Sequence, residues 1–492
     1  MRADDSGRGT TAARARARYI GALILSRWTE AATYSAAVIA AIAFARFALR
    51  RHDSYASSSY DLAFFDQIIW NTSHGRWFET TFVPYNFLGQ HFQPVLLIFA
   101  GAYRLGGGIE LLLGAQTLFV ALAAVPLYYA VRRACDSGVA ALVTACAYLL
   151  NAPLHGALDF DFHPELMGVF FVFLALYYLV AKRELATILA LLPLLALKED
   201  MPLVLAAFAL LLAVRGHRRA GVALLAVAAA WAIAVVLLVM PWLRDGSSDL
   251  TARYAYLSEG SNALTLVPHI AARAMEHLTS GPADAVVRLL STTGFLALLS
   301  PITLLGALPN TLLSTLADHP QQSTLDLHYV IAPLSLIWVG VTLALGDVRA
   351  GAGIARLVRR VGRGEVRVLL ASAVVLAAAA WTFQSDSPYA FGEHGAATSD
   401  AHLAALDAGV RIIPPDASVS AQTTIGPHLA HRRELYEFPN LGDAEYVIVD
   451  PTLPVTGQSH DAGYDGVLAS IGELGYGEIF SRDGVRVLKK KQ

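Results

Sequence analysis

Long apolar runs separated by short polar connections dominate this sequence up to about Trp381. Hydrophobic residues make up 55% of the 492 residues and charged residues only 15%, whereas soluble proteins carry about a quarter charged residues. A run of about 20 apolar residues crosses the hydrocarbon core of a bilayer as a helix. The chain is therefore expected to be an α-helical polytopic membrane protein.

Eleven apolar runs are expected to form transmembrane helices, although several are shorter than a full span. Neighbouring runs that are split by proline or polar residues are expected to be tilted or broken. The run 92–105 is interpreted as a juxtamembrane or half-buried helix, because counting it as a span would reverse the orientation of every later loop. The expected spans are 29–49, 110–131, 136–151, 164–181, 185–198, 200–214, 220–242, 285–299, 301–316, 328–346 and 366–383.

Basic residues indicate the orientation, because cytoplasmic loops of membrane proteins are rich in arginine and lysine. In the eleven-span arrangement most basic loops fall on the same side as the basic N-terminus, residues 1–28. We therefore expect a multi-pass protein of the cell membrane with a cytoplasmic N-terminus. The transmembrane domain covers 29–383, and its first outer loop covers 51–109.

The tail from 384 to 492 differs in character from the rest of the chain. It carries many charges, and it contains short runs of β-type residues at 419–422, 446–449 and 485–488 and a helical pattern at 463–474. These patterns predict a small α/β domain on the extracytoplasmic side. The domain contains no cysteine, so burial of apolar side chains must stabilise it.

The first outer loop contains two carboxylates five residues apart, Asp61 and Asp66, with Gln67 beside the second. On a helix this spacing points the two carboxylates in different directions. One is expected to face a cavity, where it can act as a general base, while the other caps or pairs locally. The alternative is a solvated amphipathic helix on which Asp61 is only an N-cap.

Further ionisable and polar residues stand at the ends of spans on this same outer side. Such groups are costly to desolvate at the membrane edge, which makes them candidates for function. We expect one cavity that opens on the outer face; the plainer alternatives are helix starts, tight turns with a local ion pair and interfacial loops. The candidate substrate-binding residues are Gln67, His91, Asp161, His163, Glu165, Lys198, Glu199, Asp200, Arg253, His319, Gln321, His328 and Tyr329.

The segment 159–165 places three carboxylates and a histidine at the entrance of a span. Such a set can ligate a divalent metal, contact substrate or cap the following helix. The spacing matches no defined metal motif, so no cofactor is predicted with certainty and a divalent metal stays open. No nucleotide-binding loop or basic nucleic-acid groove is present, and no nucleic acid is expected as a partner.

The order and spacing of several short motifs resemble a family of predicted bacterial membrane proteins of unassigned function, grouped by fold with the GT-C glycosyltransferases. The resemblance covers most of the chain. The motifs are Asp61 to Gln67 with Trp70, His74-Gly75, His91-Phe92-Gln93-Pro94, His163-Pro164-Glu165, Lys198-Glu199-Asp200, His328-Tyr329 and, in the tail, Pro414 to Val419, Pro427-His428-Leu429 and Tyr446 to Asp450.

This resemblance implies a GT-C-like enzyme that transfers a sugar, with inversion, from a polyprenyl-phosphate donor on the outer face of the membrane. The acceptor would be an envelope glycan or protein, and membrane lipid would be a partner. Asp61 best matches the position of the catalytic base, with Asp66 second. Two other functions fit the same residues: a transporter or flippase for a lipid-linked or polar solute, and a non-catalytic envelope assembly protein.

Overall fold

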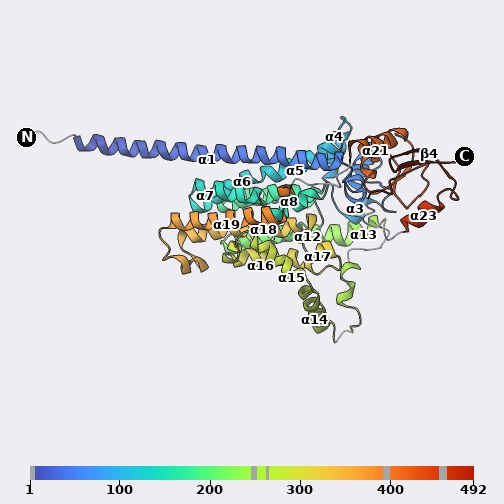
Figure 1. The fold of residues 1–492 in the computed structure, drawn as a ribbon. Coiled ribbons are helices and arrows are strands. Elements are labelled where there is room, and N and C mark those ends of the chain that lie inside the picture. Colours follow the sequence, from blue (N-terminus) through green and yellow to red (C-terminus); the bar gives the residue numbers. More distant parts are fainter. Residues whose placement is uncertain (1–5, 245–251, 262–264, 392–398, 454–462, 492) are drawn as a thin grey trace, which may run out of the picture.

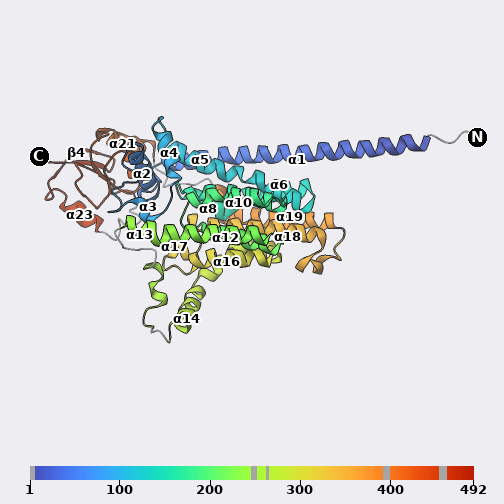
Figure 2. The same ribbon diagram turned by 180° about the vertical axis from the view of Figure 1, so that it is seen from behind.

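The computed structural model describes residues 6–244, 252–261, 265–391, 399–453 and 463–491. Its helices form an elongated bundle, and the long helix α1 (Ser6–Asp53) extends well beyond one end of it (Figure 1). A small domain formed by the C-terminal part of the chain packs at the other end, as the view from behind also shows (Figure 2). The start of α1 and the C-terminal domain therefore lie at opposite ends of the molecule.

Among the described residues, six helical segments are long and apolar enough to cross a membrane, and three more apolar helices are shorter. The chain is thus a multi-pass helical membrane protein, as the sequence predicts. The expected count of eleven spans stays a prediction, because several of the runs give shorter helices. The six segments are Arg27–Asp53, Ile109–Cys135, Gly138–Asp159, Arg218–Leu243, Pro320–Leu357 and Gly364–Asp386, and the shorter ones are Pro164–Val180, Glu184–Ala196 and Pro202–Val214.

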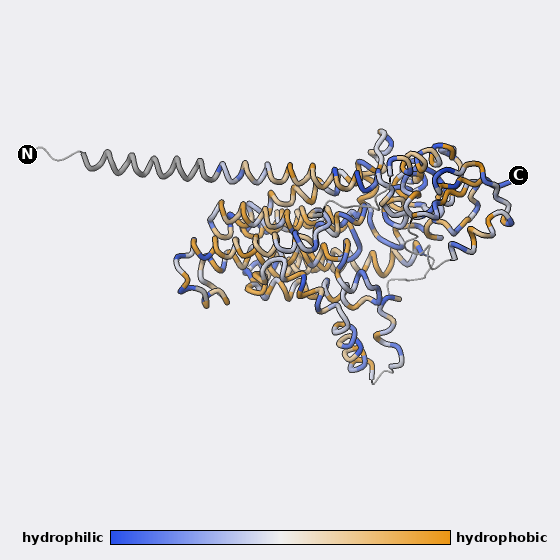
Figure 3. The backbone as a smooth tube through the Cα atoms, viewed as in Figure 1, coloured by the Kyte–Doolittle hydropathy of each residue, from blue (hydrophilic) through white to orange (hydrophobic). Residues whose placement is uncertain are grey.

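The helix α18 (Ile331–Ala350) forms the centre of the bundle. It is apolar around its whole circumference, and Trp338 in its middle is fully buried. Helices at the periphery instead expose apolar side chains, among them Ile39 of α1 and Leu237 on the segment that follows α12, as expected for a surface in contact with lipid. The hydropathy colouring shows the same predominance of apolar residues along the bundle (Figure 3).

The other helices of the bundle surround α18. They are α5 (Ile109–Leu122), α6 (Ala124–Cys135), α7 (Gly138–Leu149), α8 (Ala152–Asp159), α9 (Gly168–Val180), α10 (Glu184–Leu191), α11 (Pro202–Val214), α12 (Arg218–Ala232), α13 (Met240–Leu243), α15 (Pro282–Ser291), α16 (Pro301–Thr315) and α19 (Gly364–Asp386). The helix α14 (Leu266–Thr279) projects sideways from the bundle (Figure 1).

Short helical elements make up the first loop, between α1 and α5. They are a single π-helical turn, η1 (Ser59–Ala63), followed by α2 (Phe64–Ser73), α3 (Phe87–Gln90) and α4 (Leu96–Tyr103). The helix α4 has only eight residues, in keeping with the short juxtamembrane helix expected within 92–105. Ser58 rather than Asp61 precedes η1, so Asp61 does not occupy the N-cap position.

The C-terminal domain is built on a five-stranded sheet with the strand order β2-β1-β3-β5-β4. The strand β1 pairs in parallel with β2 and β3, whereas β5 runs antiparallel to β3 and β4. The small α/β fold is therefore as predicted, whereas the strands β2 and β4 and the helix α21 lacked a recognised pattern. The elements are α21 (Asp400–Ile412), β1 (Val419–Ala421), η9 (Gly426–Leu429), β2 (Leu435–Glu437), β3 (Tyr446–Val449), α23 (Tyr464–Ser470), β4 (Tyr476–Arg482) and β5 (Val485–Lys490).

The C-terminal domain is joined directly to the first loop. The backbone N–H of Ser59 donates to the carbonyl of Thr423 at 2.8 Å, and Gln67 Nε2 donates to the carbonyl of Arg433 at 3.0 Å. Gly426 of η9 approaches η1 so closely that a Cβ at this position would lie 2.0 Å from Ser59 Oγ. A side chain at position 426 would displace the Ser59 hydroxyl, so this close contact favours a glycine and helps to position the domain over η1.

Candidate functional site

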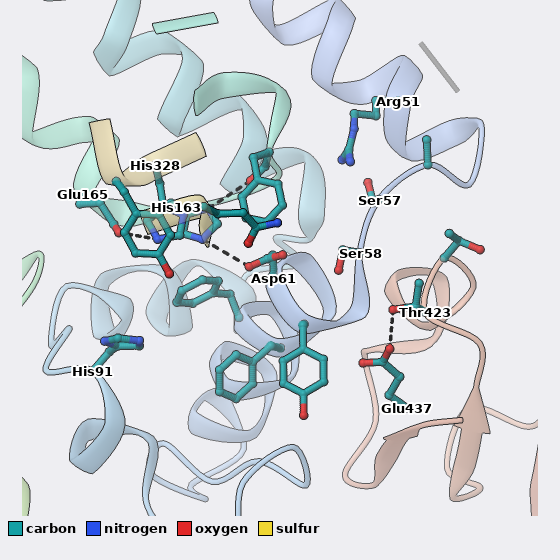
Figure 4. A pocket seen from close by; sticks show the side chains of 18 of the residues that line it. Arg51, Ser57, Ser58, Asp61, His91, His163, Glu165, His328, Thr423 and Glu437 are labelled. Atoms are coloured by element: carbon teal, nitrogen blue, oxygen red, sulfur yellow. Dashed lines mark hydrogen bonds and ion pairs between the residues drawn. The ribbon is translucent and has the colours of Figure 1, made fainter. Parts of the chain in front are cut away.

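A cavity of about 840 Å³ lies between the end of the helical bundle, the first loop and the C-terminal domain. The bundle side contributes segments around His163, Lys198 and His328, the first loop contributes η1 with the residues before it, and the C-terminal domain contributes Thr423 and Glu437 (Figure 4). The volume is within the usual range for sites that enclose small molecules. Of the predicted site residues, Asp61, His91, His163, Glu165, Lys198, Arg253, His319, Gln321, His328 and Tyr329 line it.

Asp61 and His163 form a carboxylate–imidazole pair at the wall of the cavity. His163 Nε2 lies 3.4 Å from Asp61 Oδ1, and the Asp61 side chain is 17% exposed while His163 is almost fully buried. His163 Nδ1 lies 3.1 Å from the carbonyl of Phe160, which can only accept, so Nδ1 carries the hydrogen. The imidazole is thereby oriented with Nε2 toward Asp61 (Figure 4).

A second ion pair lies deeper in the same cavity. Lys198 Nζ donates to Glu165 Oε1 at 2.8 Å, and Gln93 Nε2 donates to the other carboxylate oxygen at 3.2 Å. Burial disfavours the charge of Lys198, but the nearby carboxylates, Glu165 foremost, outweigh burial and raise the pKa of the ammonium group. The lysine is therefore a permanent cation within the cavity.

Two imidazole rings and a guanidinium group lie close to this ion pair. The ring of His328 stacks on that of His163 with a centroid distance of 3.8 Å, and His328 Nε2 lies 3.9 Å from Glu165 Oε1. Arg253 donates to the side-chain carbonyl of Gln322 and lies 3.4 Å from the Tyr329 hydroxyl. Burial and the charge of Arg253 lower the pKa of His319, so that imidazole is neutral at pH 7. The cations Lys198 and Arg253 suit a phosphate group.

The two carboxylates that follow Lys198 differ in environment. Glu199 accepts from the backbone N–H of Phe92 and lies 2.9 Å from His91 Nδ1. Burial opposes its charge, but His91 outweighs this effect and lowers the pKa of Glu199 to about 2. Burial instead raises the pKa of Asp200 to about 6. Glu199 thus fastens the loop that carries His91, and neither carboxylate lines the main cavity.

Asp161 supports the cavity from behind. It pairs with Arg51 and accepts from the backbone N–H of Ser58 at 2.7 Å, which fixes the loop before η1. Burial raises the pKa of this carboxyl group, although Arg51 opposes the effect. The buried Gln116 of α5 bonds to the Asp161 carbonyl and to the His163 N–H, and so holds both residues in place.

Asp66 and Gln67 lie outside this cavity. Asp66 is fully buried, accepts from the Tyr103 hydroxyl at 2.5 Å and pairs with His431 of the C-terminal domain at 3.0 Å. Gln67 is also fully buried, and it binds Thr80, Thr81 and the carbonyl of Arg433. Asp61 and Asp66 thus point in different directions, and only Asp61 faces the cavity.

The segment 159–165 does not gather its side chains around one point. Asp161 turns to Arg51, His163 to Asp61 and Glu165 to Lys198. Within the described ranges, no group of three or more histidine, cysteine, aspartate or glutamate side chains is arranged to hold a metal ion.

Several lining residues carried no signal that the sequence reasoning recognised. Thr423, Thr424 and Glu437 belong to the C-terminal domain, and their place in the cavity depends on how that domain docks. Ser57 and Ser58 precede η1, in a stretch where only the charged and aromatic residues indicate a site. Gln116, which does not line the cavity but bonds to Asp161 and His163, was detectable in principle, because it is a lone amide within an otherwise apolar span.

The fold and the cavity define a multi-pass membrane protein with a charged site that is covered by a small α/β domain. The chain belongs to the family described as "Predicted membrane protein (DUF2079)", whose model matches residues 51–487. This match confirms the family resemblance that the sequence motifs indicated. No curated protein shows a significant match.

The structure is also similar to the crystal structure of ArnT from Cupriavidus metallidurans in the apo state. The two chains are 14% identical, the TM-score is 0.48, and the similarity covers 91% of this chain and 97% of that chain.

Proposed function

We propose that the protein is a membrane glycosyltransferase of GT-C type that moves a sugar from a polyprenyl-phosphate donor to an acceptor hydroxyl. The observation that carries this proposal is the division of one cavity into two chemical regions. The Asp61–His163 pair supplies a base at one wall, and Lys198 and Arg253 supply fixed positive charge at another. Transfer from a phosphate-linked donor needs both, because a proton must leave and a phosphate must accept charge.

A smaller pocket of about 370 Å³ adjoins the cavity and supports an amphiphilic donor. It shares Glu165, Lys198, Arg253 and His328 with the cavity, and it adds Glu199 and Asp200. Its apolar lining comes from Leu203, Val236, Leu313, Ile331 and Ala332. A lipid phosphate bound at the shared cations would extend its first isoprenoid units along these apolar side chains. Burial of that apolar surface would add to the binding free energy.

The proposed reaction is a direct displacement with inversion. Asp61 takes the proton of the acceptor hydroxyl, and the resulting oxygen attacks the anomeric carbon. The bond from that carbon to the phosphate oxygen breaks, and the electron pair leaves with the lipid phosphate. Lys198 and Arg253 stabilise the charge that develops on the phosphate. His163 packs beside Asp61, with Nε2 at 3.4 Å from the carboxylate.

The test is an assay with the full-length protein reconstituted in lipid and a panel of undecaprenyl-phosphate-linked sugars. The wild type is expected to form a glycosylated product and release undecaprenyl phosphate. Asp61→Asn should lower the rate by about 10²- to 10⁴-fold, because it removes the base while keeping the shape. The matched control is Asp136→Asn at the turn between α6 and α7, which is exposed and outside the cavity.

Full activity of Asp61→Asn would exclude Asp61 as the base. Movement of the lipid-linked sugar between leaflets without any product would exclude the transferase and favour a flippase. Cellular function that survives when no lipid-linked sugar is bound or consumed would favour an assembly protein.

A further inference from the structure

The wall of the cavity opposite Lys198 and Glu165 has a composition that the proposed reaction does not use. The C-terminal domain contributes Thr423, Thr424 and Glu437, and the first loop contributes Ser57, Ser58 and Tyr60. We call these six residues the hydroxyl wall. Figure 4 shows Thr423 and Glu437 on the C-terminal domain, across the cavity from His328 and Glu165.

The hydroxyl wall is a built surface rather than a chance meeting of two domains. Thr423 Oγ1 donates to Glu437 Oε1 at 2.6 Å, which orients the carboxylate. The backbone bond from Ser59 to Thr423 and the close contact of Gly426 with Ser59 lock the two halves together. The Thr424 hydroxyl is buried and has no hydrogen-bond partner among the described residues. A buried polar group without a hydrogen-bond partner costs free energy, and a ligand that bonds to this hydroxyl would remove that cost.

The chemistry of the wall selects a class of ligand. Short hydroxyls donate and accept, and a carboxylate accepts two or more bonds, which suits the many hydroxyls of a sugar. Burial and the charge of Glu437 raise the pKa of Tyr60, so its phenol stays neutral and can donate. The same negative charge repels a phosphate, which leaves the phosphate of a donor to the cations on the other side.

We propose that the hydroxyl wall binds the acceptor and that the acceptor is a glycan, held through its hydroxyls by Glu437 and Thr424. The acceptor hydroxyl would then enter from the side of the C-terminal domain and meet Asp61, which lines the same cavity. This inference rests on the proposed function for the role of the glycan as acceptor. The binding of a glycan at the wall can be measured without catalysis.

The experiment measures binding of two probes to the full-length protein in lipid nanodiscs. The first probe is a panel of neutral tetrasaccharides of glucose, mannose and N-acetylglucosamine, and the second is undecaprenyl phosphate. Glu437→Gln and Thr424→Val should each weaken tetrasaccharide binding about tenfold, because each removes a hydrogen bond to the sugar. Both variants should bind undecaprenyl phosphate like the wild type.

Two further variants separate binding from folding. Thr424→Ser keeps the hydroxyl and should restore tetrasaccharide binding. Glu473→Gln changes an exposed carboxylate of the same domain outside the cavity and should leave both probes unaffected. If Glu437→Gln unfolds the domain, it will also lose undecaprenyl phosphate binding or thermal stability. In that case the proposal is tested by comparing tetrasaccharide binding of Thr424→Val with that of Thr424→Ser.

The proposal is overturned if no tetrasaccharide binds or if Glu437→Gln and Thr424→Val both bind the tetrasaccharide as tightly as the wild type. It is also overturned if a short unglycosylated peptide binds to the hydroxyl wall instead. The failure of the proposed function looks different. In that case the wild type does not bind undecaprenyl phosphate, or binds it independently of Lys198 and Arg253. Tetrasaccharide binding at the hydroxyl wall can still be observed in that case.

Discussion

At the scale of residues, this protein places charges where a membrane protein can least easily tolerate them, and neighbouring groups match Glu165 and His163. Glu165 is fully surrounded by donors, with Lys198 at 2.8 Å and Gln93 at 3.2 Å. His163 is fixed by a backbone carbonyl on one nitrogen and faces Asp61 with the other. Such matching explains how a charged cavity persists beside lipid.

Removing one partner of the buried Lys198–Glu165 pair should lower the stability of the protein far more than removing both partners. Lys198→Met leaves Glu165 buried without its cation, and we expect a loss of about 3–5 kcal/mol in the free energy of unfolding. Adding Glu165→Gln to Lys198→Met should recover most of this loss. Denaturation of the purified protein in detergent measures both variants and the single Glu165→Gln.

The control for this cycle is an ion pair at the surface. Arg349 and Glu365 lie 3.2 Å apart, and Glu365 is largely exposed. Arg349→Met should therefore change stability by less than about 1 kcal/mol. Equal losses for Arg349→Met and Lys198→Met, or strict additivity of the Lys198 and Glu165 changes, would contradict the interpretation.

At the scale of elements, the contact between η1 and η9 determines the shape of the cavity. The two short turns come from residues more than 360 positions apart, and they meet at Ser59 and Gly426. The approach is so close that the Ser59 side chain occupies the space that a side chain at position 426 would need.

Gly426→Ala should push η9 away from η1 and destabilise the docked C-terminal domain by about 1–3 kcal/mol. The added Cβ would lie 2.0 Å from Ser59 Oγ but 3.3 Å from Ser59 Cβ. The double change Gly426→Ala with Ser59→Ala should therefore regain most of the stability. Thermal unfolding followed by hydrogen exchange of 399–453 measures the effect.

Gly466→Ala in α23 is the matched control, because a Cβ there has no atom within 4 Å. It should be neutral or slightly stabilising, since alanine favours a helix over glycine. Failure of Ser59→Ala to rescue Gly426→Ala would show that the steric contact is not the cause of the loss.

Sequence patterns predict the elements of this protein better than they predict how the elements meet. Apolar length identifies the spans and β-type runs identify β1, β3 and β5, because both signals are local. The strand β2 has only three residues and its position depends on docking against β1 and Thr81, so no local pattern reveals it.

For the candidate site, charge at the membrane edge selected Asp61, His163, Glu165 and Lys198, which line the cavity, because the cost of desolvation makes such residues rare in membrane proteins. The same signal also selected Asp66 and Gln67, whose polar atoms instead join two domains. Thr423, Thr424 and Glu437 are ordinary residues of a polar domain. Only the docked structure distinguishes them from their neighbours.

At the scale of the whole molecule, the link between the bundle and the C-terminal domain carries a titratable contact. His431 of the C-terminal domain pairs with Asp66 of α2, and Tyr103 of α4 and Glu110 of α5 also lie nearby. Burial disfavours the charge of His431, but the hydrogen bond and charge of Asp66, with Glu110, outweigh it and raise the pKa of the imidazole.

This shift predicts that docking weakens at alkaline pH. A raised pKa means that the docked form binds the proton more tightly, so the stabilisation is complete below the unfolded value of about 6.5 and is lost as the pH rises through the raised value. Hydrogen exchange in Phe64–Ser73, corrected for its intrinsic rate, should be better protected at pH 6 than at pH 9.

His431→Gln keeps a polar side chain but does not titrate, so this variant should lose the difference in protection between the two pH values. An unchanged difference in His431→Gln would assign the effect to another group. The histidine is about half exposed, so the expected change in protection is modest, a few-fold at most.

The bond between Ser59 and Thr423 also sets an order of events during biosynthesis. The residues 57–60 are translated more than 360 positions before Thr423, Thr424 and Glu437. The helices can enter the bilayer while the chain is still growing, but the cavity lacks one side until the C-terminal domain has been made and has folded against η1. A shorter nascent chain would therefore hold Asp61 and Lys198 in place and still lack the part of the hydroxyl wall that the C-terminal domain contributes.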